Sequence, residues 1–180
     1  MHHPNIVKLF DSFETNSHLC FVMELCAGGD LLSYVRRRKK LDESHARFFF
    51  RQIASGLRYC HKNLVVHRDI KLDNLLIDEE GSIKICDFGV SRQLEHRSQL
   101  LSGQSGTPAY MAPEVHAAKN YDGFACDVWS LGVCLFAMVC GAVPFKGKTI
   151  EDLAAAIQKA EFVYPDSMDK HLSPEIQNLL

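Results

Sequence analysis

The chain has 180 residues, a length typical of one domain, and its 47% hydrophobic and 23% charged residues exclude a disordered chain. A net charge of −2 gives no sign of a nucleic-acid partner or a membrane surface. Seven cysteines without a C-x-x-C pair argue against a disulfide framework or a zinc site. We therefore expect reduced thiols in an intracellular, cytoplasmic protein.

The first elements are a strand and a short helix. His18 to Glu24 is apolar and predicts a strand, and Ala27 to Asp30 predicts a turn. Leu31 to Val35 predicts one or two helical turns. The basic run Arg36 to Lys40 is interpreted as a solvated helix end, with a nuclear-localisation patch as the alternative.

A long helix is expected next, with Asp42 as its N-cap and Glu43 in its first turn. Apolar residues then recur at steps of three and four, which predicts one buried helix face: Ala46, Phe49, Phe50, Ile53, Leu57 and Cys60.

Short apolar runs follow at Leu64 to Val66, Leu75 to Ile77 and Ile83 to Cys86. The last two flank Glu79-Glu80-Gly81, which predicts a small hairpin. Ser91 to Gly106 is polar and aperiodic, so we expect a mobile loop there.

The stretch from Val128 to Phe145 carries no charged side chain and is just long enough to span a membrane. Gly132, Gly141 and Pro144 interrupt it, and Asp127 would cap it with no basic anchor nearby. We therefore expect no membrane span, but a buried core helix within a helical pattern from Phe124 to Cys140.

Three separated clusters carry the chemistry. Asp69, Asn74 and Asp87 offer hard oxygen ligands that suit Mg²⁺, and Lys71 could neutralise a transferring phosphoryl group. These residue types leave phosphoryl transfer and metal-assisted hydrolysis both open. The clusters are His67-Arg68-Asp69-Ile70-Lys71-Leu72-Asp73-Asn74, Asp87-Phe88-Gly89 and Gly106-Thr107-Pro108-Ala109-Tyr110-Met111-Ala112-Pro113-Glu114.

In this order the clusters resemble the catalytic loop, the metal-binding triplet and the end of the activation segment of eukaryotic protein kinases. The resemblance implies an α+β, protein-kinase-like fold, mostly the helical large lobe with the last strands of the small lobe and the hinge. Over residues 1–180 it implies a small-lobe remnant at 1–23, a hinge at 24–30 and an incomplete large lobe at 31–180.

The resemblance also implies the catalytic roles. Asp69 accepts the proton of the substrate hydroxyl, Lys71 steadies the γ-phosphate of ATP, and Asn74 and Asp87 hold Mg²⁺. Lys71 together with Gly106-Thr107-Pro108 resembles serine/threonine kinases, so Thr107 joins the expected catalytic set, and the expected substrate is a protein.

In the nucleotide site, Met23 is similar to the gatekeeper residue, and the backbones of Glu24 and Cys26 would bond adenine. Leu76 would form the floor of the adenine pocket. Plain core packing of Met23 and Leu76 would hold at the same time.

Gly28-Gly29-Asp30 and Pro144-Phe145 resemble the calmodulin-dependent and AMP-activated-kinase-like group. Asp30 and Asp73 fall where related kinases keep acids that receive a basic residue upstream of the phosphorylated site. The alternative for both is a solvated acid or one that contacts the ribose of ATP.

Further residues match structural and regulatory positions of the family. Arg68 implies regulation by phosphorylation of the activation segment by an upstream kinase. The usual threonine three residues before Gly106 is replaced by Gly103, so Ser102 and Ser105 are the nearest candidates. Expected structural residues are His67, Phe88 and Leu9 of the hydrophobic spine, Gly89, Glu114, and Asp127 as the buried anchor of the catalytic loop.

The two ends of the sequence predict a truncated domain. No Gly-rich loop or V-A-I-K lysine precedes the first strand, and a helix predicted from Ser173-Pro174 stops at Leu180, after a helix predicted from Ile150 to Ala160. We expect a segment of an active kinase with little activity by itself. The alternative is a natural, catalytically silent short form that binds partners, and the coding sequence upstream of Met1 separates the two.

Overall fold

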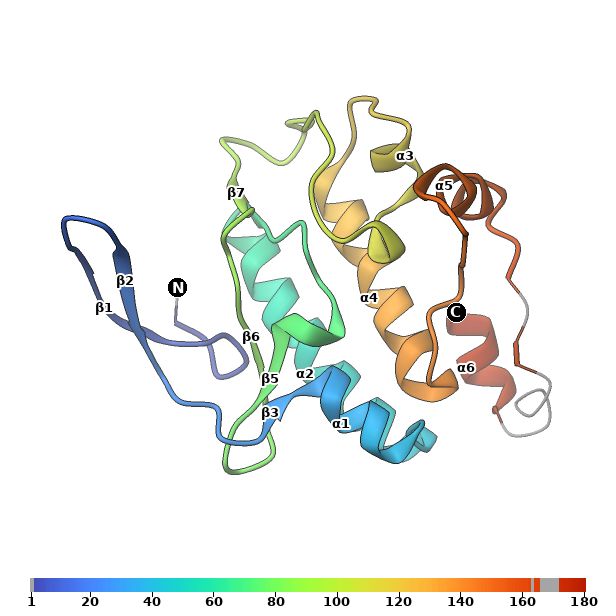
Figure 1. Ribbon diagram of the computed structural model, residues 1–180, viewed down its shortest axis with the longest axis horizontal. Helices are drawn as coiled ribbons and strands as arrows, with labels where there is room; N and C mark the ends of the chain where they lie inside the picture. Colours follow the sequence, from blue (N-terminus) through green and yellow to red (C-terminus); the bar gives the residue numbers. More distant parts are fainter. Residues whose placement is uncertain (1, 163, 166–171) are drawn as a thin grey trace.

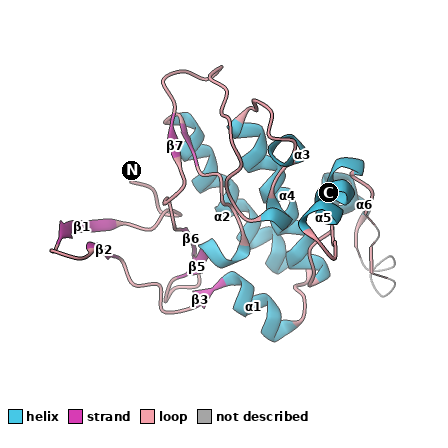
Figure 2. Ribbon diagram, turned by 45° about the horizontal axis from the view of Figure 1, so that its top comes forward, coloured by secondary structure: helices cyan, strands magenta, loops and turns pink. Residues whose placement is uncertain are grey.

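The computed structural model describes residues 2–162, 164–165 and 172–180. Figure 1 shows two unequal parts, a two-stranded hairpin that extends away from the molecule and a helical body to which all the other elements belong. Figure 2 shows that, apart from this hairpin, the short strands lie along one side of the helices.

The projecting hairpin pairs β1 (Leu9–Glu14) with β2 (Leu19–Met23). The predicted strand at 18–24 is thus confirmed, whereas its partner β1 was not predicted. Every residue of β1 is exposed. Leu9, which the resemblance placed in the hydrophobic spine with His67 and Phe88, is 52% exposed.

A three-stranded sheet joins the hairpin to the body in the order β3–β5–β6: β3 (Gly29–Asp30), β5 (Leu75–Ile77) and β6 (Ile83–Ile85). The predicted hairpin is confirmed, because β5 and β6 are antiparallel and Asp78 Oδ1 accepts the Ser82 amide at 2.7 Å. A parallel bridge from Ile6 to Ile85 ties the N-terminal segment to this sheet.

α1 and α2 are the first two helices of the body. α1 (Leu31–Arg38) runs beyond the predicted turns, and Arg36, Arg37 and Arg38 form its last turn, exposed as expected of a helix end. α2 (Glu43–Lys62) begins at the predicted N-cap, where Asp42 accepts the His45 amide at 2.9 Å. Its predicted apolar face is confirmed, with only Phe50 partly exposed.

The core helix α4 (Gly123–Cys140) lies at the centre of the body (Figure 1). The sequence interpretation of Asp127 as its cap is wrong, because Asp122 caps the helix by accepting the Phe124 amide, and Asp127 lies more than one turn inside. Among the described residues it is the one helix long and apolar enough to cross a membrane, but 78% of it is buried inside the protein. That burial supports the interpretation as a core helix.

The remaining elements complete the body: β4 (Val65–Val66), β7 (Arg92–Gln93), α3 (Pro113–His116), α5 (Ile150–Lys159), α6 (Pro174–Leu179) and the 3₁₀ turns η1 (Leu72–Asn74) and η2 (Pro108–Tyr110). Ser173 caps α6 as predicted. The aperiodic segment 91–106 is not wholly loop, since β7 within it pairs with β4.

Candidate active site

A buried carboxylate on α4 anchors the segment from His67 to Asn74, which the sequence analysis compared with a catalytic loop. Asp127 is 1% exposed. Its Oδ2 accepts the His67 amide at 2.9 Å and its Oδ1 accepts the Arg68 amide at 2.8 Å. His61, at the end of α2, brings Nε2 to 2.8 Å from Oδ2 as a third partner. These contacts fix the backbone immediately before Asp69, where Arg68 has a φ of +68°.

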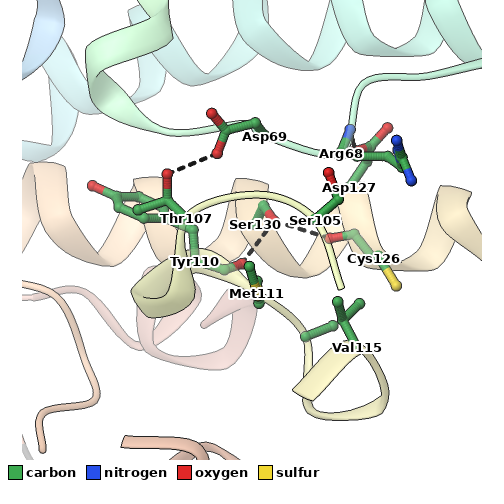
Figure 3. A pocket seen from close by; sticks show the side chains of 11 residues that line it. Arg68, Asp69, Ser105, Thr107, Tyr110, Met111, Val115, Cys126, Asp127 and Ser130 are labelled. Atoms are coloured by element: carbon green, nitrogen blue, oxygen red, sulfur yellow. Dashed lines mark hydrogen bonds between the residues drawn. The ribbon is translucent and has the colours of Figure 1, made fainter. Parts of the chain in front are cut away.

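Asp69 lies at the centre of a closed set of polar contacts. Lys71 Nζ is 2.9 Å from Asp69 Oδ2 and donates to Thr107 Oγ1 at 2.8 Å. Thr107 in turn donates to Asp69 Oδ1 at 2.8 Å, and Figure 3 shows this hydroxyl reaching the carboxylate from the opposite segment. Asn74 Nδ2 donates to Asp69 Oδ2 at 3.0 Å and to its carbonyl at 2.9 Å.

These contacts decide the ionisation of Asp69. Burial raises the pKa of its carboxyl, but hydrogen bonds from Lys71, Thr107 and Asn74 and the charge of Lys71 outweigh burial and hold the pKa below its usual value. The carboxylate is therefore ionised at neutral pH and can accept a proton.

Asp87 lies two residues after β6 and is exposed, with a φ of +59°. Its Oδ1 accepts the Gly89 amide at 3.2 Å. The neighbouring Phe88 ring meets the His67 ring edge-on at 4.8 Å, which joins this segment to the catalytic loop. Burial and then the Asp87 carboxylate raise the pKa of the Cys86 thiol to about 11, so this cysteine is a weak nucleophile.

Two residues could hold a metal here. The amide nitrogen of Asn74 is used by Asp69, which leaves its amide oxygen as the ligand, and Asp87 presents an exposed carboxylate. The described residues include no group of three His, Cys, Asp or Glu side chains that could hold a metal without help. The set fits Mg²⁺, which takes one or two protein ligands and completes its shell with phosphate oxygens and water.

The segment that carries Thr107 packs against the catalytic loop. Gly106 has a φ of +108°, and a Cβ atom on it would lie 2.4 Å from the Arg68 carbonyl oxygen. Only glycine permits this approach. Behind it, Ser130 of α4 donates to the Tyr110 carbonyl at 2.7 Å, visible in Figure 3.

The expected nucleotide residues are spread from the hairpin to the sheet: Met23 ends β2, Glu24 and Cys26 follow it, and Leu76 lies in β5. The amide of Glu24 donates to the Lys8 carbonyl at 2.9 Å, and its side chain pairs with Lys84 at 3.2 Å. The Cys26 carbonyl accepts the Gly29 amide at 3.3 Å. Met23 is 53% exposed, and Leu76 on β5 is partly exposed.

The two expected substrate acids differ in how they are used. Asp30 caps α1, and its carboxylate accepts from Ser33 N at 2.7 Å and Ser33 Oγ at 2.9 Å. Asp73 in η1 is exposed. Asp73 is therefore the more available of the two to an incoming cation.

Of the expected regulatory residues, Arg68 and Ser105 line the same small pocket, which Figure 3 shows. Arg68 Nε donates to the Val90 carbonyl at 2.6 Å, and no acid in the described part of the chain pairs with it. Ser102 is exposed and Ser105 partly buried. Glu114 is partly buried, and its Oε1 accepts from the Cys126 thiol at 3.4 Å.

Two residues of this site were missed from the sequence. His61 contacts Asp127, and Tyr121 contacts the segment before Thr107. His61 is not one of the α2 residues that recur at steps of three and four, so the apolar pattern does not identify it. Tyr121 lies in a turn where no periodic pattern identifies a buried side chain.

An ionised aspartate lies in mutual contact with a lysine and a threonine in a mostly helical domain, and two further oxygen donors lie nearby. This arrangement fits the resemblance seen in the sequence. The comparison with family models agrees, since the protein kinase domain matches residues 1–180. The chain belongs to the protein kinase family.

Two curated relatives are similar to this chain. CBL-interacting serine/threonine-protein kinase 7 of Arabidopsis thaliana is 44% identical over 180 residues, which is 99% of this chain and 42% of that protein. NUAK family SNF1-like kinase 2 of Rattus norvegicus is 44% identical over 165 residues, 92% of this chain and 26% of that protein. The chain thus spans less than half the length of both. The first name includes the serine/threonine class expected from the sequence, and the second is that of an SNF1-like kinase.

Proposed function

We propose that the protein to which these residues belong transfers the γ-phosphate of ATP to serine or threonine hydroxyls of protein substrates. The observation that carries this proposal is the Asp69 carboxylate, held ionised between Lys71 and Thr107. Phosphoryl transfer needs positioning, charge neutralisation and a proton acceptor, and these side chains can supply all three.

The residues divide the work by position. Asp69 accepts the hydroxyl proton of the substrate, and Lys71 neutralises charge beside it. Asn74 and Asp87 would hold Mg²⁺, which supplies positive charge to the phosphates when bound. The Glu24 carbonyl and the Cys26 amide would orient adenine over Leu76.

A basic residue upstream of the phosphorylated site is the proposed substrate preference. The exposed carboxylate of Asp73 supports it, whereas Asp30 already accepts two hydrogen bonds from Ser33. A peptide array is expected to show enrichment of Arg or Lys upstream, which Asp73→Asn reduces. A profile without a basic preference would contradict the assignment.

For the 180 residues alone we propose little phosphotransfer, because neither a Gly-rich loop nor a V-A-I-K lysine is among them. The cytoplasm is the proposed location, with the nucleus as an alternative because Arg36 to Lys40 are exposed. An upstream kinase would find its accessible acceptor at Ser102 rather than at the partly buried Ser105.

The decisive experiment measures transfer of labelled phosphate from ATP to a serine peptide by the full-length protein. Asp69→Asn should lower kcat about 10²- to 10⁴-fold, the usual contribution of a general base. Asp11→Asn on the exposed hairpin is the matched control and should leave kcat unchanged. Equal turnover by wild type and Asp69→Asn would refute the proposal, and turnover absent from wild type would favour a silent binding module.

A further inference from the structure

The segment that leads to Thr107 is fastened to a turn twenty residues further along the chain. Leu101 and Tyr121 form an isolated antiparallel bridge, with each amide donating to the other residue's carbonyl at 2.9 Å. We call residues 101–107 the strap. Its first residue is thus fixed by backbone contacts to the turn that precedes α4.

The Tyr121 side chain adds a second attachment. Its ring is 3% exposed and packs in a small apolar cluster with Ala112 and Val115, against which Leu101 also packs. Its hydroxyl donates to the Gly103 carbonyl at 3.1 Å. One residue therefore holds the strap at two points, by its backbone at Leu101 and by its hydroxyl at Gly103.

Gly103 itself suits this arrangement and not a phosphorylated side chain. Its φ is +79°, a conformation that residues with a Cβ atom rarely adopt. A threonine, which the kinases that this chain resembles have at this position, would be strained here. The departure from the family pattern noted in the sequence therefore coincides with the position where Tyr121 holds the chain.

The far end of the strap is the catalytic site. Gln104 Nε2 donates to the His116 carbonyl at 2.9 Å, Gly106 lies directly against the Arg68 carbonyl, and Thr107 donates to Asp69 at 2.8 Å. Leu101 and Gly103, which Tyr121 holds, lie six and four positions before Thr107. The Tyr121 contacts therefore bear on the same short segment as the contact with Asp69.

We propose that Tyr121 is a positioning residue that holds the strap in the catalytic arrangement without a phosphate on it. The inference deepens the proposed kinase function and rests on it. A phosphate on Ser102 that pairs with Arg68 is the rival means of holding the strap. In the structure Arg68 instead donates to Val90, and the strap is already in place.

The test uses full-length protein and compares Tyr121→Phe, which removes only the hydroxyl, with Tyr34→Phe on α1 as the matched control. Loss of one hydrogen bond should open the strap and lower kcat about two- to tenfold in Tyr121→Phe alone. Hydrogen exchange should speed up at amides 101 and 103–107 and not in α4. The melting temperature of Tyr121→Phe should stay within a few degrees. If the hydroxyl had a merely structural role, its loss would instead lower stability without changing kcat per folded molecule.

A second measurement separates the proposal from its rival. Treating the wild-type protein with a broad-specificity protein phosphatase should leave kcat unchanged, and Gly103→Thr should lower it. A tenfold loss after phosphatase treatment, or unchanged exchange at 101–107 in Tyr121→Phe, would overturn the proposal. Because exchange is measured without substrate, it still tests the strap if the protein proves to have no kinase activity, in which case only the proposed function fails.

Discussion

The β1–β2 hairpin and helix α4 are both rich in apolar residues, yet they have opposite environments. Phe10 and Phe13 of the hairpin are 58% and 50% exposed, whereas Leu135 and Met138 of α4 are 2% and 0% exposed. Hydrophobic content alone does not decide burial, since most of α4 packs against other elements, whereas β1 is paired only along its edge with β2. The difference predicts where substitutions destabilise the protein and where they do not.

The largest effect is expected at the buried anchor of the catalytic loop. Asp127→Ala leaves the amides of His67 and Arg68 without an acceptor and removes the partner of His61, so we expect a loss of about 3–5 kcal/mol in the free energy of unfolding. Asp11→Ala in the hairpin should change it by less than about 0.5 kcal/mol. Urea unfolding measures both, and similar values for the two variants would remove the contrast between the regions.

The next largest effect is expected from the same substitution, leucine to alanine, made once in α4 and once in the hairpin. Leu135→Ala opens a cavity in the core and should cost about 2–5 kcal/mol. Leu19→Ala on the hairpin, where Leu19 is 63% exposed, should cost far less in the 180-residue chain. If the Leu19→Ala cost rises toward that of Leu135→Ala in a longer form of the protein, residues outside these 180 cover the hairpin.

The smallest effect concerns pH and the Asp69 carboxyl. Its pKa is lowered in the folded state, so its contribution to stability is present above the unfolded pKa of about 3.9 and is lost as the pH falls through the folded pKa. The difference in unfolding free energy between wild type and Asp69→Asn should therefore shrink below about pH 4. Unfolding curves from pH 3 to 7 measure it, with Asp11→Asn as control, and a constant difference would contradict the expected ionisation.

The sequence predicted the long elements because they carry a period or a terminal signal. The buried face of α2 follows steps of three and four, and Asp42 and Ser173 mark helix starts that the structure retains. β1 was missed because apolar and polar residues do not alternate along it, and β7 because two residues make no pattern. Short strands exist only through their partners, which one local window of sequence does not contain.

The candidate site shows the same division. The clusters around Asp69, Asp87 and Thr107 were recognisable by residue type, and the structure brings Asp69 and Thr107 into contact across 38 positions. The assignment of Asp127 as a helix cap was wrong because an aspartate before an apolar run resembles an N-cap whether it starts the helix or lies inside it. Tyr121 and His61 act through long-range contacts, for which the chain has no local signal.

The anchoring of the catalytic loop by Asp127 has a consequence for synthesis. The loop amides and their acceptor are 60 and 59 positions apart in the chain. A ribosome that adds 5–20 residues per second makes Asp127 about 3 to 12 seconds after the loop. During that interval the nascent loop has no acceptor for those amides, so the order of translation itself delays the formation of the reactive centre until the central helix has emerged.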